Sequence, residues 1–254
     1  MVVPPRIAFL IGGVQKGGTT ALASYLAAHP GVDLPAGKEA HLFDDPGYDD
    51  DWTAADVDAR FAAHWNAPAA GRLCGDATPI TMAHAQLVQR VARYNPAMRW
   101  IVLLRDPVER AVSHYHMIRS WGAEPHSLFR AILAEPFRLR RDADAWAPGS
   151  PARYWSYVAR GRYARQLDRL FRHFPREQVL LLRSRDLAAR PAETMALVLA
   201  FLGLPPYPRA PAFAPQFQGR YPPLPWWSPG GWLLRLRLAG EKRALRRRHG
   251  IALD

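Results

Sequence analysis

Apolar runs that stop at glycines or charged residues form the first pattern along this chain. Residues 6–12 form a short apolar run that ends in glycines, which is typical of a buried strand. Over residues 19–29 the apolar positions adopt helical spacing, and Pro30 and Gly31 end that segment. Residues 100–104 are continuously apolar between two arginines, a pattern that favours a central strand of a parallel sheet.

The alternation of strand and helix continues through most of the chain. Further strands are expected at 32–34, 73–76 and 179–182, and further helices at 83–94, 154–174 and 192–201. The order predicts an α/β fold, a P-loop-like, doubly wound, mainly parallel sheet flanked by helices. Sheets of this type bind ligands at the carboxyl ends of their strands.

A helix is predicted directly after the strand at 100–104. Asp106 is a good N-cap, Pro107 suits the first helical position, and Glu109 occupies the capping-box position. We therefore expect this helix to begin at Pro107.

The length and composition suit one domain. A chain of 254 residues that is 49% hydrophobic can bury one sizeable core, so we expect a single domain over 1–254. No stretch reaches the roughly 20 apolar residues that a membrane helix needs. The run at 6–12 leads directly into a glycine loop, so we interpret it as fold and not as a secretory signal. Cys74 is the only cysteine, which excludes an intrachain disulfide and makes the cytoplasm the expected location.

The net charge of +12 is concentrated near the C-terminus. A proline- and glycine-rich loop is expected at 203–231, and the basic segment that follows it, 232–254, carries about half of the excess charge. Large apolar residues lie among its arginines. The segment is therefore a peripheral contact with an anionic membrane, a site for an acidic partner, or a final helix with a solvated basic face. This uneven distribution argues against a nucleic-acid-binding protein.

The strongest local signal is a glycine-rich loop between a predicted strand and a predicted helix, Gly13-Val14-Gln15-Lys16-Gly17-Gly18-Thr19-Thr20. Glycines let the backbone fold into a concave nest, and the helix adds its N–H groups and the positive end of its dipole. The loop therefore predicts an anion site. Its spacing nearly matches a nucleotide P-loop, but Thr19 stands where a P-loop has its lysine, and Lys16 lies earlier.

A second signal follows the strand at 100–104. Arg105 leaves the end of that strand, and Ser113 lies two helical turns past the cap, on the same face as Asp106. An arginine and a hydroxyl that converge at the carboxyl end of a strand suit a terminal phosphate. By itself the pattern is equally compatible with a salt-bridged arginine and a helix-surface serine.

Together the two signals resemble the sulfotransferases that use PAPS (3′-phosphoadenosine 5′-phosphosulfate), most closely the heparan sulfate sulfotransferase branch and its bacterial relatives. Residues 16–20 resemble their 5′-phosphosulfate loop, and residues 105–113 resemble their 3′-phosphate motif. Four further segments are similar, namely an acidic catalytic segment at 38–44, a Gly-Asp-Ala-Thr-Pro segment at 75–79, a Gly-x-Tyr helix start at 160–163, and a late loop at 218–221. The similarity runs in family order from residue 7 to about residue 221.

The resemblance implies transfer of a sulfuryl group from PAPS to a hydroxyl or amine, with PAP (the 3′,5′-bisphosphate) as product. Lys16 would bind the bridging oxygen between phosphate and sulfate, and the phosphate would be bound by Gly17, Gly18, Thr19 and Thr20. Arg105 and Ser113 would bind the 3′-phosphate, under a late loop that contributes Gly219, Arg220 and Tyr221. Glu39 would be the general base, with His41 orienting it or contacting the acceptor.

Some positions depart from the heparan sulfate branch. Ala77 and Gln218 each replace a lysine, and Asp76 replaces a glutamate. The lost cations argue against a heparin-like acceptor and leave a glycan, a glycolipid or a small metabolite open. The histidines lack metal-ligand spacing, so no metal is expected.

Two alternatives remain to the sulfotransferase interpretation. A P-loop kinase-like phosphotransferase is disfavoured by the missing lysine after Gly18. A nucleotide-binding fold without turnover is disfavoured by the presence of Lys16 and Glu39.

Overall fold

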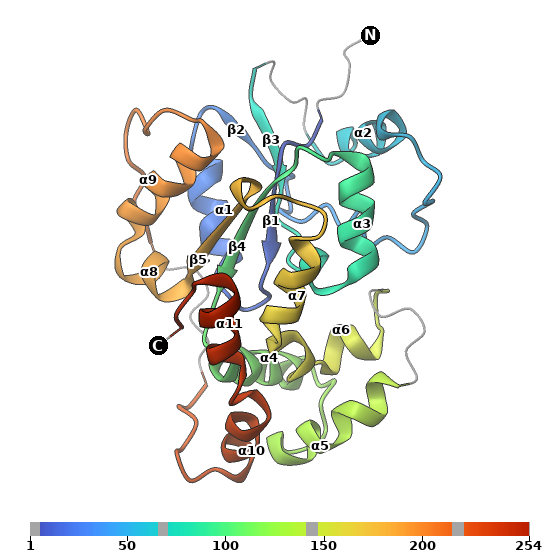
Figure 1. Ribbon diagram of the computed structural model, residues 1–254, viewed down its shortest axis with the longest axis vertical. Coiled ribbons are helices and arrows are strands. Elements are labelled where there is room, and N and C mark those ends of the chain that lie inside the picture. Colours follow the sequence, from blue (N-terminus) through green and yellow to red (C-terminus); the bar gives the residue numbers. More distant parts are fainter. Residues whose placement is uncertain (1–5, 66–70, 141–146, 215–220, 254) are drawn as a thin grey trace. The chain divides into compact units, whose positions relative to one another are not determined.

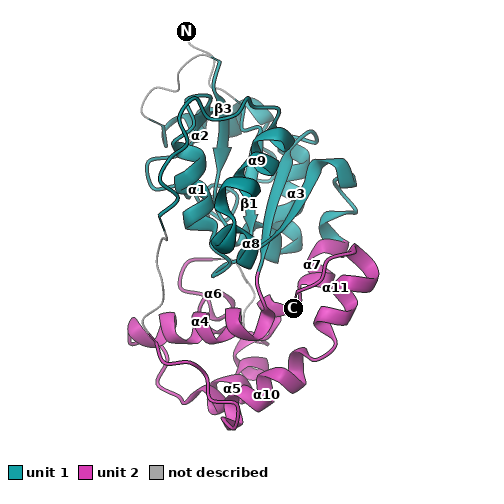
Figure 2. Cartoon of the chain, turned by 90° about the vertical axis from the view of Figure 1, so that its left-hand side faces the viewer, with its two compact units in different colours: residues 1–104, 169–217 teal, residues 105–168, 218–254 magenta. Residues whose placement is uncertain are grey.

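The computed structural model describes residues 6–65, 71–140, 147–214 and 221–253 (Figure 1). The chain divides into two compact units (Figure 2). Unit 1 comprises Met1–Leu104 and Arg169–Phe217, and unit 2 comprises Arg105–Asp168 and Gln218–Asp254. Each unit contains its own hydrophobic cluster. The expectation of a single domain over 1–254 stays a prediction.

Unit 1 is built on a parallel sheet. Its described strands are β1 (Phe9–Gly13), β2 (Val32–Asp33), β3 (Leu73–Asp76), β4 (Arg99–Leu104) and β5 (Val179–Arg183). They lie in the order β2-β3-β1-β4-β5, and every pair of neighbours is parallel. β1 is buried along its whole length and β4 nearly so, which explains their continuous apolar runs. The predicted α/β class with a mainly parallel sheet is confirmed.

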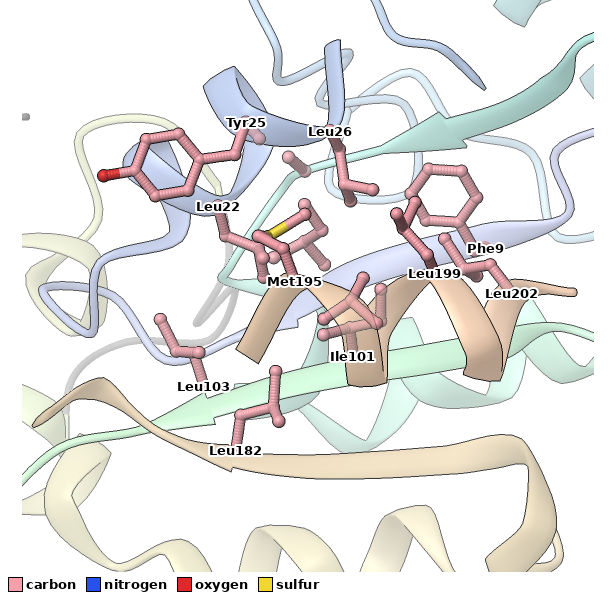
Figure 3. Close-up of a cluster of buried hydrophobic side chains, with 14 of the residues drawn as sticks. Phe9, Leu22, Tyr25, Leu26, Ile101, Leu103, Leu182, Met195, Leu199 and Leu202 are labelled. Carbon is pink, nitrogen blue, oxygen red and sulfur yellow. The ribbon is translucent and has the colours of Figure 1, made fainter. Parts of the chain in front are cut away.

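Helices cover both faces of this sheet, and Figure 1 shows α1, α8 and α9 on the face opposite α2 and α3. Their bounds are α1 (Thr19–Ala27), α2 (Ala54–Ala62), α3 (Ala85–Tyr94), α8 (Ser184–Ala189) and α9 (Pro191–Leu202), with 3₁₀ turns at Thr81–Ala83 and Arg176–Gln178. Alternate strand residues such as Phe9, Ile101 and Leu182 pack against Leu22 and Leu199 from the helices (Figure 3). This packing sets the register of the sheet because a slip of one residue would turn these side chains to the other face.

Unit 2 is helical. It contains α4 (Pro107–Ser120), α5 (Leu128–Leu139), α6 (Pro151–Trp155), α10 (Pro229–Leu238) and α11 (Glu241–His249), together with most of α7 (Tyr163–Leu170) and a 3₁₀ turn at Ala159–Gly161. Its hydrophobic cluster joins buried residues of α4, α5 and α10. No helix in the described ranges is both long enough and apolar enough to cross a bilayer.

Two expectations about helix bounds were wrong. The periodic stretch 154–174 is not one helix, because the chain leaves helical geometry at Ser156 and α7 begins at Tyr163. The buried Glu135 carboxylate accepts hydrogen bonds from the N–H groups of Val158 and Ala159 at 2.8 and 2.7 Å, which holds the intervening segment in a turn. The loop expected at 203–231 also ends early, since α10 starts at Pro229 with a Ser228 side-chain cap.

Candidate functional site

The glycine-rich loop connects β1 to α1 and folds tightly against the end of β4. The Val14 N–H donates to the Leu103 carbonyl oxygen at 2.9 Å, and the Gly17 N–H donates to the Val14 carbonyl oxygen at 2.8 Å. A Cβ at position 17 would lie 2.7 Å from the Leu103 carbonyl oxygen, closer than side chains approach backbone. Glycine is therefore required at position 17 by the space between the loop and β4.

Ser184 also holds the loop, and sequence reasoning missed it. This serine opens α8 directly after β5, and its hydroxyl donates to the carbonyl oxygen of Gly17. The two residues are 167 positions apart, so no local pattern connects them. The only available signal was its position at the carboxyl end of a predicted strand, where ligand-binding groups gather.

The first turn of α1 is suited to an anion. Its N-cap is Gly18, in the left-handed region at φ 98°, and it offers no side-chain oxygen to the first-turn amides. The first turn contains no acidic residue, and Lys16 and Thr20 are partly exposed at the loop. A helix N-terminus without a carboxylate or a side-chain cap favours a negatively charged ligand.

The acidic segment forms a chain of three ionisable side chains. His41 Nε2 lies 3.0 Å from Glu39 Oε2, and His41 Nδ1 lies 2.9 Å from Asp44 Oδ2. The Asp44 side chain is 1% exposed, so His41 is held from inside the protein. Lys38 also forms an ion pair with Glu39. Sequence reasoning included Asp44 in the motif but assigned it no role.

These contacts set the protonation states. Hydrogen bonds to Asp44 and then to Glu39 raise the pKa of His41 to about 9, so the imidazole is a cation at neutral pH. Burial by itself would raise the pKa of Glu39, but hydrogen bonds and charge from His41 and Lys38 outweigh it and lower that pKa. Glu39 is therefore a carboxylate at neutral pH, able to accept a proton.

The same segments carry unusual backbone geometry. Among the described residues other than glycine, positive φ occurs at Lys16 (68°), Lys38 (62°) and His41 (53°). Left-handed backbone costs energy for residues with a Cβ, and such residues concentrate at functional sites. The glycine loop and the acidic segment were predicted from sequence to be functional, and the residues with positive φ lie in these same two segments.

The carboxyl end of β3 positions the acidic segment. Asp76, the last residue of β3, is fully buried and accepts a hydrogen bond from the Ala40 N–H at 2.7 Å. The Ala77 N–H donates to the Lys38 carbonyl oxygen at 3.0 Å, and the His41 N–H donates to Thr78 Oγ1 at 3.3 Å. Because β3 and β1 are parallel neighbours, the acidic segment and the glycine loop lie at the same edge of the sheet.

Burial raises the pKa of Asp76 to about 6, despite its hydrogen bonds from Ala40 and Thr78. The folded state then holds a proton that the unfolded chain releases near pH 4, so this group lowers stability as pH rises from about 4 to 6. We expect the free energy of unfolding of Asp76→Asn, relative to that of wild type, to rise by about 2 kcal/mol as the pH increases from 4 to 7. Urea unfolding of both proteins across that range measures the difference. A difference that does not change with pH would contradict the assignment.

The residues predicted for a terminal phosphate belong to unit 2. The Asp106 side chain accepts from the N–H groups of Val108 and Glu109, both at 2.9 Å, so the predicted cap and helix start are confirmed. Arg105 Nε lies 3.1 Å from Glu109 Oε2, and Ser113 is buried on α4.

The late loop returns to the same helix. The ring of Tyr221 stacks on His116, three residues after Ser113 on α4, with centroids 4.5 Å apart and planes inclined by 6°. The other two late-loop residues predicted to bind the donor, Gly219 and Arg220, lie outside the described residues. Within the part of the chain that is described, no group of three His, Cys, Asp or Glu side chains is arranged to hold a metal ion.

The sequence matches a protein family over most of its length. Residues 6–210 match the sulfotransferase domain family. The chain is 31% identical over 195 residues to heparan sulfate glucosamine 3-O-sulfotransferase 3B1 of Mus musculus, an alignment that covers 77% of this chain and 45% of that protein. It is also 31% identical over 198 residues to heparan sulfate glucosamine 3-O-sulfotransferase 6 of Homo sapiens, an alignment that covers 77% of this chain and 52% of that protein. The chain thus spans about half the length of these curated relatives.

A solved structure matches nearly the whole chain. The crystal structure of a sulfotransferase from Alicyclobacillus acidocaldarius superposes with a TM-score of 0.76 at 25% identity and covers 98% of both chains. This match extends past residue 210, where the family match ends.

Proposed function

Because this chain belongs to the sulfotransferase domain family, we propose that it is an enzyme that transfers a sulfuryl group from PAPS to a hydroxyl or amine of an acceptor. The observation that carries the proposal is the pairing of two features at one sheet edge. The Glu39 carboxylate, which His41 keeps ionised, lies near the carboxyl end of β3. The glycine loop, which is suited to an anion, lies at the carboxyl end of the neighbouring strand β1. A general base and a phosphosulfate site are what this transfer requires.

The proposed mechanism assigns each residue a charge that it can carry at neutral pH. Glu39 accepts the proton of the acceptor hydroxyl as the new S–O bond forms. Lys16 stabilises the negative charge that develops on the bridging oxygen as the bond between sulfur and that oxygen breaks. His41, held by Asp44, keeps the Glu39 carboxylate oriented and ionised. Residues 17–20 bind the 5′-phosphate through backbone and hydroxyl donors.

We further propose that the 3′-phosphate binds to Arg105 and Ser113, with Gly219, Arg220 and Tyr221 from the late loop. Arg105 is 30% exposed and already engages a carboxylate, Glu109, through its guanidinium group. A guanidinium group that pairs with a carboxylate has the planar geometry to pair with a phosphate. Binding of the donor would replace the Glu109 carboxylate on Arg105 with the 3′-phosphate.

Binding of PAP, AMP and ATP-magnesium, measured by isothermal titration, tests this donor site. We expect PAP to bind about 10- to 100-fold more tightly than AMP, because a charge-assisted phosphate contact contributes about 1.5–3 kcal/mol. Arg105→Ala should remove most of that preference, whereas Arg243→Ala, an exposed arginine on α11, should preserve it. Tight ATP-magnesium binding together with equal affinities for PAP and AMP would instead support the kinase-like alternative.

The acceptor remains open among a glycan, a glycolipid and a small molecule. The two lysines that this chain lacks at positions 77 and 218 disfavour a polyanionic sugar. Activity without a metal, a cytoplasmic location and the absence of a nucleic-acid partner remain predictions, as does a membrane contact through residues 232–254.

A further inference from the structure

Exposed large apolar side chains concentrate in unit 2. Nine such side chains are exposed among the described residues, and eight of them belong to unit 2. The exception is Leu197 on α9 of unit 1, which is 59% exposed. Scattered exposed apolar residues are ordinary, but a concentration of them on one part of a protein marks an interaction surface.

The outer face of α10 carries an apolar stripe between arginines. Trp232 and Leu236, one turn apart, are 62% and 57% exposed. Arg235 and Arg237 are also exposed, and at helical spacing they lie on either side of the stripe. The opposite face of α10 is buried in the hydrophobic cluster of unit 2.

The outer face of α5 repeats this pattern. Phe129, Leu133 and Phe137 are exposed at i, i+4 and i+8, so they form one stripe along the helix. The Arg140 guanidinium lies 5.7 Å from the centroid of the Phe137 ring, and Arg130 is exposed beside the stripe. A stripe of this kind on a helix surface otherwise faces a core.

The two stripes lie on neighbouring helices that share one hydrophobic core. A Cβ at Gly230 would lie 2.8 Å from Leu128 Cγ, so the start of α10 packs closely on the start of α5 (Figures 1 and 2). The inner faces of both helices, including Ile132 and Leu234, belong to the same cluster. Both stripes therefore point away from that shared core.

A tryptophan pair adjoins α10. Trp226 and Trp227, in a proline-rich turn, are 83% and 67% exposed, and Arg235 Nη1 donates to the Trp226 carbonyl oxygen at 3.3 Å. We name the exposed side chains of α5, of α10 and of this turn the α5–α10 face. Over residues 128–139 and 221–238 the only acidic residue is Glu135, which is buried, so the charge of the face is entirely positive.

We propose that the α5–α10 face binds the surface of an anionic lipid membrane. Tryptophan and phenylalanine side chains enter the boundary between headgroups and acyl chains, and arginines at the edges of the stripes pair with lipid phosphates. A second copy of this chain would bring arginine against arginine, which disfavours a homodimer through this face. The face includes the α10 part of the segment 232–254 predicted from sequence. It does not include α11, where Lys242 and Arg248 form ion pairs with Asp106 and Asp168 at 2.7 and 2.8 Å.

Flotation of the full chain with vesicles tests the proposal, using phosphatidylcholine alone and phosphatidylcholine with phosphatidylserine at low salt. We expect the protein to float with the anionic vesicles, and its tryptophan emission to shift to shorter wavelength. The double variant R235Q/R237Q should lose about fivefold in partition coefficient per arginine. The double variant R246Q/R247Q on α11 is its matched control and should lose clearly less.

A second pair of variants tests the apolar stripe. L236S should weaken flotation, whereas L197S, with nearly the same exposure on unit 1, should leave it unchanged. Circular dichroism and PAP affinity of all variants should match wild type. A loss of membrane binding can then be distinguished from a loss of the donor site. Absence of flotation with anionic vesicles would overturn the proposal. So would unchanged flotation of both test variants, or a concentration-dependent dimer that L236S dissociates without any vesicle binding.

Discussion

Glu39→Gln is expected to lower turnover by about 10² to 10⁴ while leaving the affinity for PAP nearly unchanged. Glutamine keeps the shape of the side chain and can still accept a hydrogen bond from His41, whose Nε2 lies 3.0 Å from the carboxylate. It cannot take up the acceptor proton. The substitution therefore raises the free energy of the transition state and leaves the free energy of donor binding nearly unchanged.

Release of PAP from PAPS, measured with a panel of hydroxyl- and amine-bearing acceptors, gives the turnover, and titration with PAP gives the affinity. Glu177→Gln is the matched control, because Glu177 is exposed in the turn before β5. Full activity of Glu39→Gln on an acceptor that the wild type uses would show that the base lies elsewhere, with Asp76 the next carboxylate to test.

The sequence predicted those parts of the fold that depend on a few neighbouring residues. The run at 100–104 became β4, and Asp106 with Pro107 began α4 where predicted, because burial on both faces and capping act over a few residues. The glycine loop was likewise predicted from its own residues. Its positive φ at Gly18 and the close approach at Gly17 are the reasons why glycine occurs there.

Contacts between distant residues account for what the sequence did not predict. The helix expected at 154–174 is interrupted by hydrogen bonds from Val158 and Ala159 to Glu135, more than 20 residues away. The similarity at 160–163 indicated a helix start within those residues, and α7 begins at Tyr163, so the motif was more informative than the periodicity. No local signal pointed to the bond between Ser184 and Gly17.

The candidate site likewise combines contacts that the sequence predicted with properties that it did not predict. Glu39 and His41 were predicted through a resemblance, and the structure brings their side chains into contact. The pKa shifts in that segment depend on Asp44 and on burial, neither of which spacing reveals. The roles of Arg105, Ser113 and Tyr221 stay predictions.

Removal of the Lys16 ammonium is expected to impair both donor binding and turnover, in contrast to Glu39→Gln. Lys16→Ala should lower turnover by about 10² or more, because a cation aimed at developing charge contributes as much as an oxyanion-hole donor. It should also weaken PAP binding, since the ammonium attracts the donor's phosphate in the ground state.

Lys16→Gly separates the ammonium from the backbone. Lys16 has φ 68°, a conformation that costs residues with a Cβ about 1 kcal/mol and costs glycine little. Lys16→Gly should therefore lose as much activity as Lys16→Ala and still exceed the alanine variant in unfolding free energy by about 1 kcal/mol. Urea unfolding and PAP-release rates of the two variants measure this. Equal stability of both would show that position 16 is unstrained, and normal turnover of either would remove Lys16 from the mechanism. The expected combination, a glycine variant that is more stable than the alanine variant and equally impaired in turnover, indicates that the left-handed lysine is retained for its charge.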